Sequence, residues 1–382
     1  MFSVVMATLT APRVAVLIEM SSAHGRGLIR GIAQYAQRRT NWSLHVEETG
    51  PLRTAPPWLS AWHGEGIIAR LETTAITSAV LAKGLPVVNV SGYTSFRGTP
   101  HVDTDNRAVC ELAADYFRQR CYRHFGYCGN PRFEWSVRRQ ELFAKCLNPD
   151  PVTFAAFQFH DRQPVAQLQT WLESLPKPIA LFVCNDLHGC RVLEACEQAG
   201  LAVPDEIAVL GVDDDTILCT LCRPQLSSIA PDTEGIGYLA AQTLDSMMRG
   251  EKPPDLSQIV RPLSVQPRQS TDAAAVDQWH VSQALRYIHG NATRNICVDD
   301  VVVQARTSRR FLEKHFLAMV GRPIHTEILR VRLETAQRLL STTTLCLKDV
   351  AARSGFRRAD YLSSVFRQKL GLSPTEFRSR SR

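Results

Sequence analysis

The sequence predicts a two-lobed α/β body with parallel sheets, followed by an all-helical domain. Three observations lead to this fold class. Short apolar runs alternate with amphipathic helical patterns over 13–230, the charge balance changes near residue 275, and two segments near the C-terminus repeat each other. The 382 residues, 45% of them hydrophobic, suffice for two or three domains with apolar cores.

The front part of the sequence is typical of repeated βαβ units. Apolar runs with a length suited to buried strands occur at 13–20, 64–71, 84–90, 124–129, 179–186 and 207–215. Helical patterns occur between or beside them at 25–39, 106–121, 137–147 and 190–200. Such an alternation predicts parallel sheets that are covered by helices on both faces.

The domain boundaries follow from changes in composition. We expect a frayed N-terminus over 1–12 and an α/β body over 13–267. One lobe would comprise about 13–122 with 225–250, and the other about 123–224 with 251–267. The segment "RPLSVQPRQSTDAAAVDQ" turns polar and small toward its end, which predicts a linker over 268–278 and a helical domain over 279–382.

The charge is concentrated in the helical part. Residues 276–382 contain 19 Lys/Arg and 9 Asp/Glu, whereas the first 275 residues contain 25 and 28. A basic quarter on a slightly acidic body favours a polyanion partner, such as DNA, for that quarter alone. The sequence has no apolar run long enough for a membrane span and no basic segment of a signal peptide, so we expect a cytoplasmic protein without membrane contact.

Eleven cysteines occur without a disulfide-framework spacing. Cys219 and Cys222 are spaced like half of a metal site, but no second pair or His-x3-5-His segment follows them. We therefore expect reduced thiols, no bound metal and no cofactor.

The helical domain contains a duplicated unit. One copy runs from Asp300 to Phe316 and the other from Asp349 to Phe366, and each is followed by a Gly and then a Pro, with a helix expected over 323–342 between them. In the second copy, Gly355 suits the sharp turn between two helices, and Leu362 and Phe366 form a buried stripe. This layout predicts two helix-turn-helix units, each with one helix that enters a major groove.

The outer faces of the expected groove-entering helices carry the side chains suited to nucleic acid. Arginine and lysine bond bidentately to guanine or pair with phosphate, and serine adds short contacts. The candidates are Ser308, Arg309, Arg310, Lys314, Arg357, Arg358, Ser363, Ser364 and Arg367. The alternative is a helical bundle with a basic surface.

The segment "GFRRADYLSSVFRQKLGLSPTEFR" closely resembles the C-terminal signature of the AraC/XylS transcription regulators. The resemblance covers about 280–379 and implies two helix-turn-helix units that read adjacent major grooves, with recognition helices over 308–317 and 359–369. One departure concerns Arg306, where the first copy has no turn glycine, which leaves the geometry of that turn open.

Polar side chains follow the expected strands of the front part. Asn185, Asp213 and Asp105 stand just past strands or before a helix, and Trp135 and Arg139 lie near a helix start. In parallel sheets such positions meet at the ligand-binding edge. Carboxylates, an amide and a guanidinium suit a cluster of sugar hydroxyls, and an aromatic face suits the apolar side of a sugar ring. The alternative for each residue is a helix cap, a turn or a surface charge.

Residues 13–268 also resemble the ligand-binding part of the LacI/GalR repressors, which is similar to periplasmic sugar-binding proteins of class I. "VLGVDD", "FVCND" and the spacing of Arg139 and Phe143 carry the likeness. It implies that Asp213, Asn185, Arg139 and Asp105 contact the effector. The combination with an AraC-type reader is similar to that of the xylose-operon regulators.

This combined resemblance implies a sugar-responsive regulator, bound to double-stranded operator DNA of the nucleoid as a homodimer. It implies D-xylose as the first candidate effector and activation through RNA polymerase. A different sugar, or repression, remains open. Less favoured are a periplasmic sugar-binding protein, opposed by the basic tail, and a sugar-processing enzyme, for which the sequence offers no nucleophile–base motif or metal-ligand set.

Overall fold

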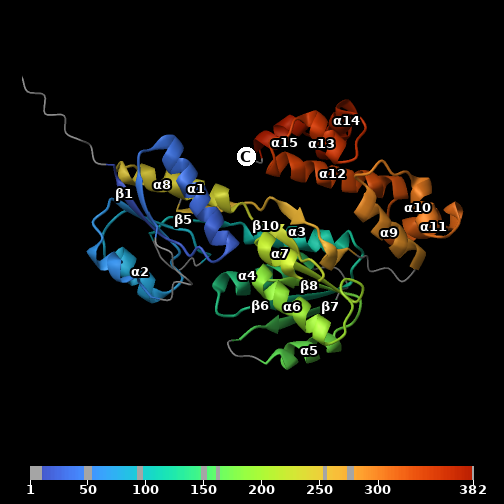
Figure 1. Ribbon diagram of the computed structural model, residues 1–382, viewed down its shortest axis with the longest axis horizontal. Helices are drawn as coiled ribbons and strands as arrows, with labels where there is room; N and C mark the ends of the chain where they lie inside the picture. Colours follow the sequence, from blue (N-terminus) through green and yellow to red (C-terminus); the bar gives the residue numbers. More distant parts are fainter. Residues whose placement is uncertain are drawn as a thin grey trace, which may run out of the picture. The chain divides into compact units, whose positions relative to one another are not determined.

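The computed structural model describes residues 11–46, 54–92, 98–147, 153–160, 164–252, 256–272 and 279–380. These residues form two six-stranded sheets with helices, followed by an all-helical region (Figure 1). The expected fold class is therefore confirmed. The chain divides into two compact units, Met1–Asp105 with Asp232–Arg261, and Asn106–Pro231 with Pro262–Arg382. None of the described helices combines the length and apolarity needed to cross a membrane.

The first unit, here called lobe 1, is a parallel sheet with the strand order β11-β5-β4-β3-β1-β2. Its strands are β1 (Arg13–Leu17), β2 (Ser43–Val46), β3 (Gly66–Ala69), β4 (Val87–Asn89), β5 (His101–Thr104) and β11 (Ser257–Val260). Its helices are α1 (Ala23–Arg39), α2 (Thr74–Leu81), α8 (Thr233–Met248) and the short 3₁₀ helix Pro57–Ala61. One apolar cluster lies under α1 and α8, and another under α2 and the 3₁₀ helix, so helices cover both faces.

The second unit begins with lobe 2, defined here as residues 106–231 and 262–272. Its sheet has the order β12-β10-β9-β8-β6-β7, in which only β12 is antiparallel to its neighbour among the described strands. The strands are β6 (His124–Gly129), β7 (Thr153–Gln158), β8 (Ile179–Val183), β9 (Ile207–Val212), β10 (Ser227–Ala230) and β12 (Ser264–Gln266). The helices are α3 (Asn106–Arg118), α4 (Glu134–Leu147), α5 (Val165–Ser174), α6 (Asp186–Gln198), α7 (Thr216–Leu221) and the 3₁₀ helix Gln269–Thr271.

The lobes divide at different residues from those expected. Helix α3 belongs to lobe 2 because it packs against α4 and β12, which moves the first boundary from residue 122 to Asp105. Strand β11 belongs to lobe 1 because it pairs with β5, although 251–267 was expected in the other lobe. The chain passes from lobe 1 to lobe 2 between β11 and β12, and the sequences of these short strands carry no signal for the lobe that each joins.

The expected linker over 268–278 begins inside lobe 2. Arg268 forms an ion pair with Asp214 at 2.6 Å, and the side chains of Ser270 and Thr271 are fully buried. Residues 273–278 of the expected linker lie outside the described residues, as do residues 1–10 of the expected frayed N-terminus.

The helical domain (279–380) consists of two units that share one long helix. Its helices are α9 (Trp279–Asn291), α10 (Val298–Gln304), α11 (Arg309–Val320), α12 (Ile324–Thr342), α13 (Leu347–Arg353), α14 (Ala359–Leu370) and α15 (Pro374–Arg380). The N-terminal half of α12 packs in a core with α9, α10 and α11, through Ile324 and Ile328. Its C-terminal half packs with α13 and α14, through Leu333, Ala336 and Leu340. One helix thus joins the two helix-turn-helix units.

Both turns of these units contain a residue in the left-handed conformation. Gly355 has φ +82°, and a Cβ added there would lie 2.5 Å from the carbonyl oxygen of Ala292, so only glycine fits. Arg306 stands at the corresponding turn of the first unit and has φ +48°. The turn without a glycine therefore adopts the same hand as its twin, at a cost of about 1 kcal/mol for a non-glycine residue.

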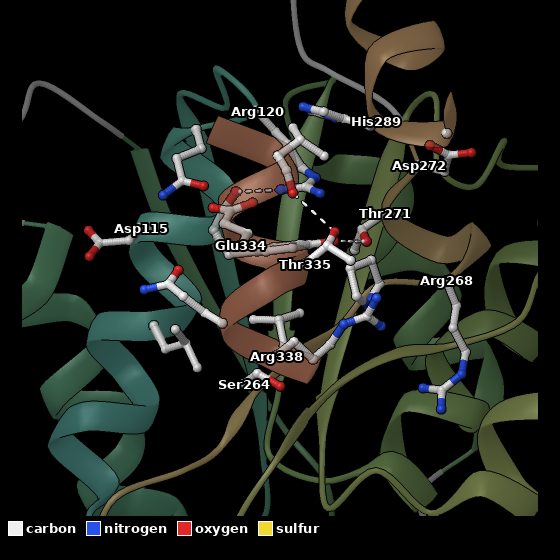
Figure 2. Close-up of a pocket in the computed structure, with 18 of the residues that line it drawn as sticks. Asp115, Arg120, Ser264, Arg268, Thr271, Asp272, His289, Glu334, Thr335 and Arg338 are labelled. Atoms are coloured by element: carbon white, nitrogen blue, oxygen red, sulfur yellow. Dashed lines mark hydrogen bonds between the residues drawn. The ribbon is translucent and has the colours of Figure 1, made fainter. Parts of the chain in front are cut away.

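The helical domain contacts lobe 2 around the end of α3. The guanidinium of Arg330 on α12 donates to the side chain of Gln119, and the Sγ of Cys121 lies 3.8 Å from the carbonyl oxygen of Met319. A cavity of about 720 Å³ is lined by residues of lobe 2 and of the helical domain. Arg120, Arg268 and Arg338 are among these side chains (Figure 2).

Candidate functional site

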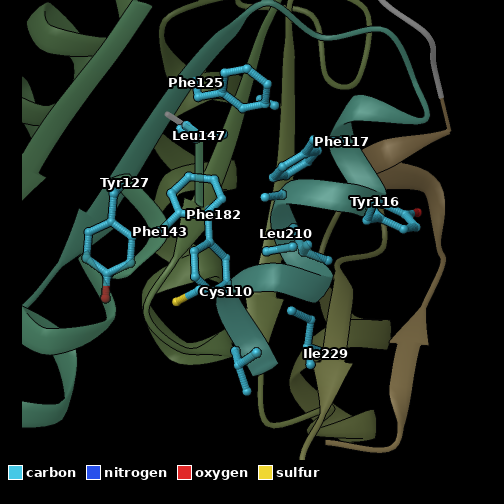
Figure 3. Packing of buried hydrophobic residues seen from close by; sticks show 14 of the residues in the cluster. Cys110, Tyr116, Phe117, Phe125, Tyr127, Phe143, Leu147, Phe182, Leu210 and Ile229 are labelled. Carbon is cyan, nitrogen blue, oxygen red and sulfur yellow. The ribbon is translucent and has the colours of Figure 1, made fainter. Parts of the chain in front are cut away.

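An aromatic cluster fixes α4 against the lobe 2 sheet. Phe143 of α4 lies with its ring centroid 5.0 Å from that of Phe182 on β8 and 6.4 Å from that of Phe125 on β6 (Figure 3). The hydroxyl of Tyr127 donates to the carbonyl oxygen of Ser136 at 2.9 Å. Close packing of these rings restricts α4 to one position, which in turn places Arg139.

Arg139 is anchored at the point where α3 begins and β8 ends. The side chain is only 6% exposed. Its Nε and Nη2 donate to Oδ1 of Asn106 at 3.0 and 2.6 Å, and its Nη1 donates to the carbonyl oxygen of Cys184 at 2.6 Å. The guanidinium carbon also lies 5.1 Å from the ring centroid of Trp135. A buried cation with such fixed partners is preorganised to orient a polar ligand.

Asn185 and Asp213 stand at the carboxyl ends of the neighbouring strands β8 and β9. Asn185 is the N-cap of α6, where its Oδ1 accepts from the backbone N–H of His188 at 3.0 Å. Asp213 is half-buried and has φ +109°, an uncommon conformation for a residue with a side chain. Backbone strain of this kind concentrates at ligand sites, because the surrounding structure must hold it in place.

The charges of Arg139 and Asp213 act on the same thiol, that of Cys184. Burial raises the pKa of Cys184 to about 12, while the charge of Arg139 lowers it and the charge of Asp213 raises it. Cys184 stands just past the end of β8, where its carbonyl oxygen accepts from Arg139 and its thiol feels the charge of Asp213. The carboxylate, the guanidinium and the Asn185 amide belong to one edge of the lobe 2 sheet.

A buried carboxylate lies beneath this edge. Asp186 is 1% exposed, and its oxygens accept from the backbone N–H of Asp215 at 2.8 Å and from the hydroxyl of Ser228 at 2.6 Å. Burial, and next the charge of Asp213, raise its pKa well above the usual range. Asp186 thereby ties the loop over 213–215 to the start of α6.

Sequence reasoning found most of this edge and missed its supports. Arg139, Trp135, Asn185 and Asp213 all belong to lobe 2, whereas Asp105 lies in lobe 1, where its backbone N–H donates to the carbonyl oxygen of Val260 at 2.8 Å. The positions that were not among the candidates are Asn106, Asp186, Ser228 and Arg268, although the motif "FVCND" places Asp186 next to Asn185 just past a strand. For Asn106 and Asp186 a signal exists, since each directly follows a predicted residue, Asp105 or Asn185, at a strand-to-helix junction. Ser228 and Arg268 have no local signal.

The first helix-turn-helix places α11 behind the capping residue Ser308, whose Oγ accepts from the backbone N–H of Phe311 at 3.3 Å. Leu312 and Phe316 are fully buried, as expected. Arg309 forms ion pairs with Glu313 at 2.9 Å and Asp299 at 3.0 Å, which restrict its reach. The side chains of Arg310 and Lys314 are exposed and have no ion-pair or hydrogen-bond partner within the described ranges.

The second unit exposes a comparable face on α14. Arg357 donates to Oδ1 of Asn295 at 2.9 Å, and Arg358 lies 3.2 Å from Asp360 with both side chains in solvent. Ser363 donates back to the carbonyl oxygen of Ala359 and is half-buried. By contrast, Ser364 and Arg367 are exposed, and the side chain of neither has a hydrogen-bond or ion-pair partner in the described part of the chain.

One exposed aromatic residue was not among the candidates. Tyr361 on α14 is 54% exposed, although it contacts Phe356. It precedes Ser364 by three positions, so both lie on the same face of the helix. Because Tyr361 lies in the first turn of the expected recognition helix, its position in the sequence could have identified it as a candidate DNA contact.

None of the described residues forms a group of three or more His, Cys, Asp or Glu side chains that would hold a metal ion. Cys219, the first half of the weak metal spacing, is buried and donates to Oδ2 of Asp186 at 3.3 Å.

Three family models match the chain. The model of the XylR N-terminal domain matches residues 13–107, that of a periplasmic binding protein-like domain 114–271, and that of a helix-turn-helix domain 302–380. These are families of transcription regulators and sensor domains, and not of enzymes.

Among curated proteins, the chain is 28% identical over 380 residues to the xylose operon regulatory protein of Escherichia coli K12, with 96% of each chain covered. It is 28% identical over 383 residues to the protein of the same name from Haemophilus influenzae, with 96% of this chain and 98% of the relative covered. A solved structure titled as the xylose-binding transcription activator XylR is similar with a TM-score of 0.64 and 28% identity, over 97% of this chain and 99% of that one.

Proposed function

The chain belongs to the XylR-like sugar-responsive transcription regulators, in which a periplasmic-binding-protein-like sensor precedes an AraC-type helix-turn-helix domain, and from this premise we propose that its effector is D-xylose. The observation that carries the proposal is the polar edge of lobe 2. There Arg139, Asn185 and Asp213 offer donors and acceptors beside the Trp135 ring, which is the chemistry that a pyranose requires. Asp105 of lobe 1 is proposed as a further effector contact.

Support for xylose over other sugars comes from the relatives, which are named for the xylose operon and for xylose binding. By the same analogy we propose activation through RNA polymerase, a homodimer on operator DNA, and a cytoplasmic location on the bacterial nucleoid. A regulator of another sugar is one alternative, which the sugar panel below tests, and a repressor of the same architecture is the other.

Two connections inside the second unit support a route from sugar to DNA. Helix α3 begins at Asn106, which holds Arg139, and the residues just after its end contact α12 and the end of α11. Asp214, next to Asp213, is paired with Arg268 in the segment that leads toward the helical domain. A sugar that binds one arrangement of these elements more tightly than another shifts the equilibrium between them. The resulting change in the free energy of DNA binding is at most the difference between the sugar's binding free energies for the two arrangements.

A panel of sugars tests the effector. D-xylose, L-arabinose, D-ribose and D-glucose are added separately to the full chain, and the melting temperature is measured. A ligand at 100 times its dissociation constant stabilises the folded state by about 2.7 kcal/mol, and at equal concentrations the sugar that binds most tightly raises the melting temperature most. We expect that sugar to be D-xylose. A larger shift with another sugar reassigns the effector, and no shift with any sugar contradicts a sugar site.

Arg358 is expected to read a base. Its side chain is 78% exposed at the start of α14 and forms an ion pair with Asp360, which is itself 84% exposed. We expect Arg358→Ala to weaken binding to operator DNA by about 1–3 kcal/mol and to leave binding to random DNA nearly unchanged. Band shifts on both DNAs measure this, with Arg353→Ala on α13 as an equally cationic control. Equal losses on the two DNAs would make Arg358 a phosphate contact instead.

A further inference from the structure

Two cysteines far apart in the sequence meet between α6 and α7. The Sγ of Cys190 on α6 lies 2.9 Å from the Sγ of Cys222, which is the C-cap of α7. The sequence spacing had pointed to Cys219 as the neighbour of Cys222, but Cys219 is bonded to Asp186 instead. A contact this short between two thiols needs to shorten by only about 0.9 Å to become a disulfide bond.

The surroundings of the pair give it both reactivity and access. The hydrogen bond with Cys190 lowers the pKa of the Cys222 thiol, which increases its thiolate fraction. Both cysteines are half-buried and line a cavity of about 270 Å³ at the surface, beside Leu221 and Glu194. A small oxidant such as hydrogen peroxide can therefore reach the sulfurs. By contrast, Cys128 and Cys196 are fully buried in the lobe 2 core.

We propose that Cys190 and Cys222 form a redox-active pair that hydrogen peroxide converts into a disulfide bond between α6 and α7. The Cys222 thiolate attacks one peroxide oxygen, the O–O bond breaks, and the leaving hydroxide takes up a proton to become water. The sulfur of Cys190 then attacks the resulting sulfenic acid, an S–S bond forms, and the sulfenic oxygen leaves as a second water. Two thiols lose two electrons and two protons, and the peroxide is reduced to two waters.

The bond would act on the loop that bears Asp213. The N-terminus of α7 is already held to α6 by the bond from the Asp215 backbone N–H to Asp186. Cys219 in the middle of α7 also donates to Asp186, and a disulfide at Cys222 adds a covalent tie at the C-terminal end of the same short helix. The loop over 213–215 is then held by a rigid α6–α7 pair, so oxidation restricts its movement. An effect of oxidation on sugar affinity rests on the proposed function, whereas formation of the Cys190–Cys222 disulfide does not depend on it.

Mapping of the bond in the full chain tests the proposal. The double variant Cys297→Ser/Cys346→Ser serves as the starting protein, because those two thiols are exposed and oxidise independently. It is treated with hydrogen peroxide, unreacted thiols are blocked, and peptides are analysed by mass spectrometry without reduction. We expect one crosslinked pair of peptides, containing Cys190 and Cys222, the loss of two titratable thiols, and recovery of both on treatment with dithiothreitol.

Matched variants separate this pair from general thiol oxidation. Cys222→Ser is expected to abolish the crosslink and the reversible loss of two thiols. Cys146→Ser removes a half-buried cysteine on α4 and is expected to leave both unchanged. Oxidation of other cysteines without a Cys190–Cys222 crosslink overturns the proposal, as does an unchanged reversible loss in Cys222→Ser. Neither readout depends on sugar binding, so a failure of the effector proposal leaves this result intact.

Discussion

Replacing Glu327 with alanine is expected to lower the free energy of unfolding of the helical domain by about 3–5 kcal/mol. Glu327 on α12 is fully buried and is the shared partner of three basic side chains. Its Oε1 accepts from Nη2 of Arg330 at 2.6 Å and lies 3.0 Å from Nε2 of His289, and its Oε2 accepts from Arg322. Removal of the carboxylate leaves the largely buried guanidinium of Arg330 without its main partner.

The pKa of Glu327 gives this prediction a pH dependence. Burial alone would raise that pKa, but the hydrogen bonds from Arg330 and His289 outweigh it and hold the pKa well below its usual range. A carboxyl with a depressed folded pKa stabilises the fold above its unfolded value of about 4.5, and this contribution is lost as the pH falls toward the folded pKa. The advantage of wild type over Glu327→Ala is therefore expected to be full above about pH 4.5 and to decrease progressively as the pH falls below that value.

Glu334 provides the matched control. It is also on α12 and pairs with the same Arg330, but its side chain is 41% exposed. A solvent-exposed ion pair contributes about 0–1 kcal/mol, so Glu334→Ala should have a small effect. Urea unfolding followed by circular dichroism measures both variants against wild type. Equal and small losses for the two variants would show that burial of the Glu327 cluster contributes nothing to stability.

The strands that the sequence predicted are those buried on both faces. "HFGYCG" at 124–129 became β6 over the same residues, because a run this short with a glycine at its end favours a buried strand over a helix. The strands β2 and β7 lie at sheet edges and alternate weakly between exposed and half-buried positions, so their short patterns resemble loops. The returning strands β11 and β12 pair with partners more than 30 residues away in sequence, β5 and β10, and no local pattern encodes such pairing.

The candidate sites show the same limit. Residues at the ends of strands were found, because chain topology alone places them at one edge of a parallel sheet. The residues that hold them were not, since Ser228 meets Asp186 only after β10 has joined the sheet. The duplicated units were found through their repeated apolar stripes. The left-handed turn at Arg306 was left open because an arginine carries no signal for positive φ, and the surrounding helices impose it.

Asp213→Asn is expected to abolish the shift in melting temperature that the effector sugar produces. Asparagine keeps the size of the side chain and tolerates positive φ better than alanine, so the strained backbone at φ +109° stays as it is. The substitution removes the negative charge beside Cys184 and replaces one acceptor oxygen with a donor. A sugar hydroxyl that donates to this oxygen then meets an N–H, and an unmatched buried polar group costs about 1–3 kcal/mol.

The folded state itself should be affected little, or even stabilised, because Asp213 repels the buried Asp186 and contributes to its raised pKa. Unfolding of the sugar-free protein, measured alongside the sugar titration, checks this. Asp205→Asn is the control: its carboxylate is 59% exposed and pairs with Arg286, outside the proposed site, so the sugar-induced shift should persist. A full shift in Asp213→Asn would exclude Asp213 as an effector ligand. A lost shift together with a lowered melting temperature of the sugar-free protein would mean instead that Asp213 holds the loop rather than the sugar.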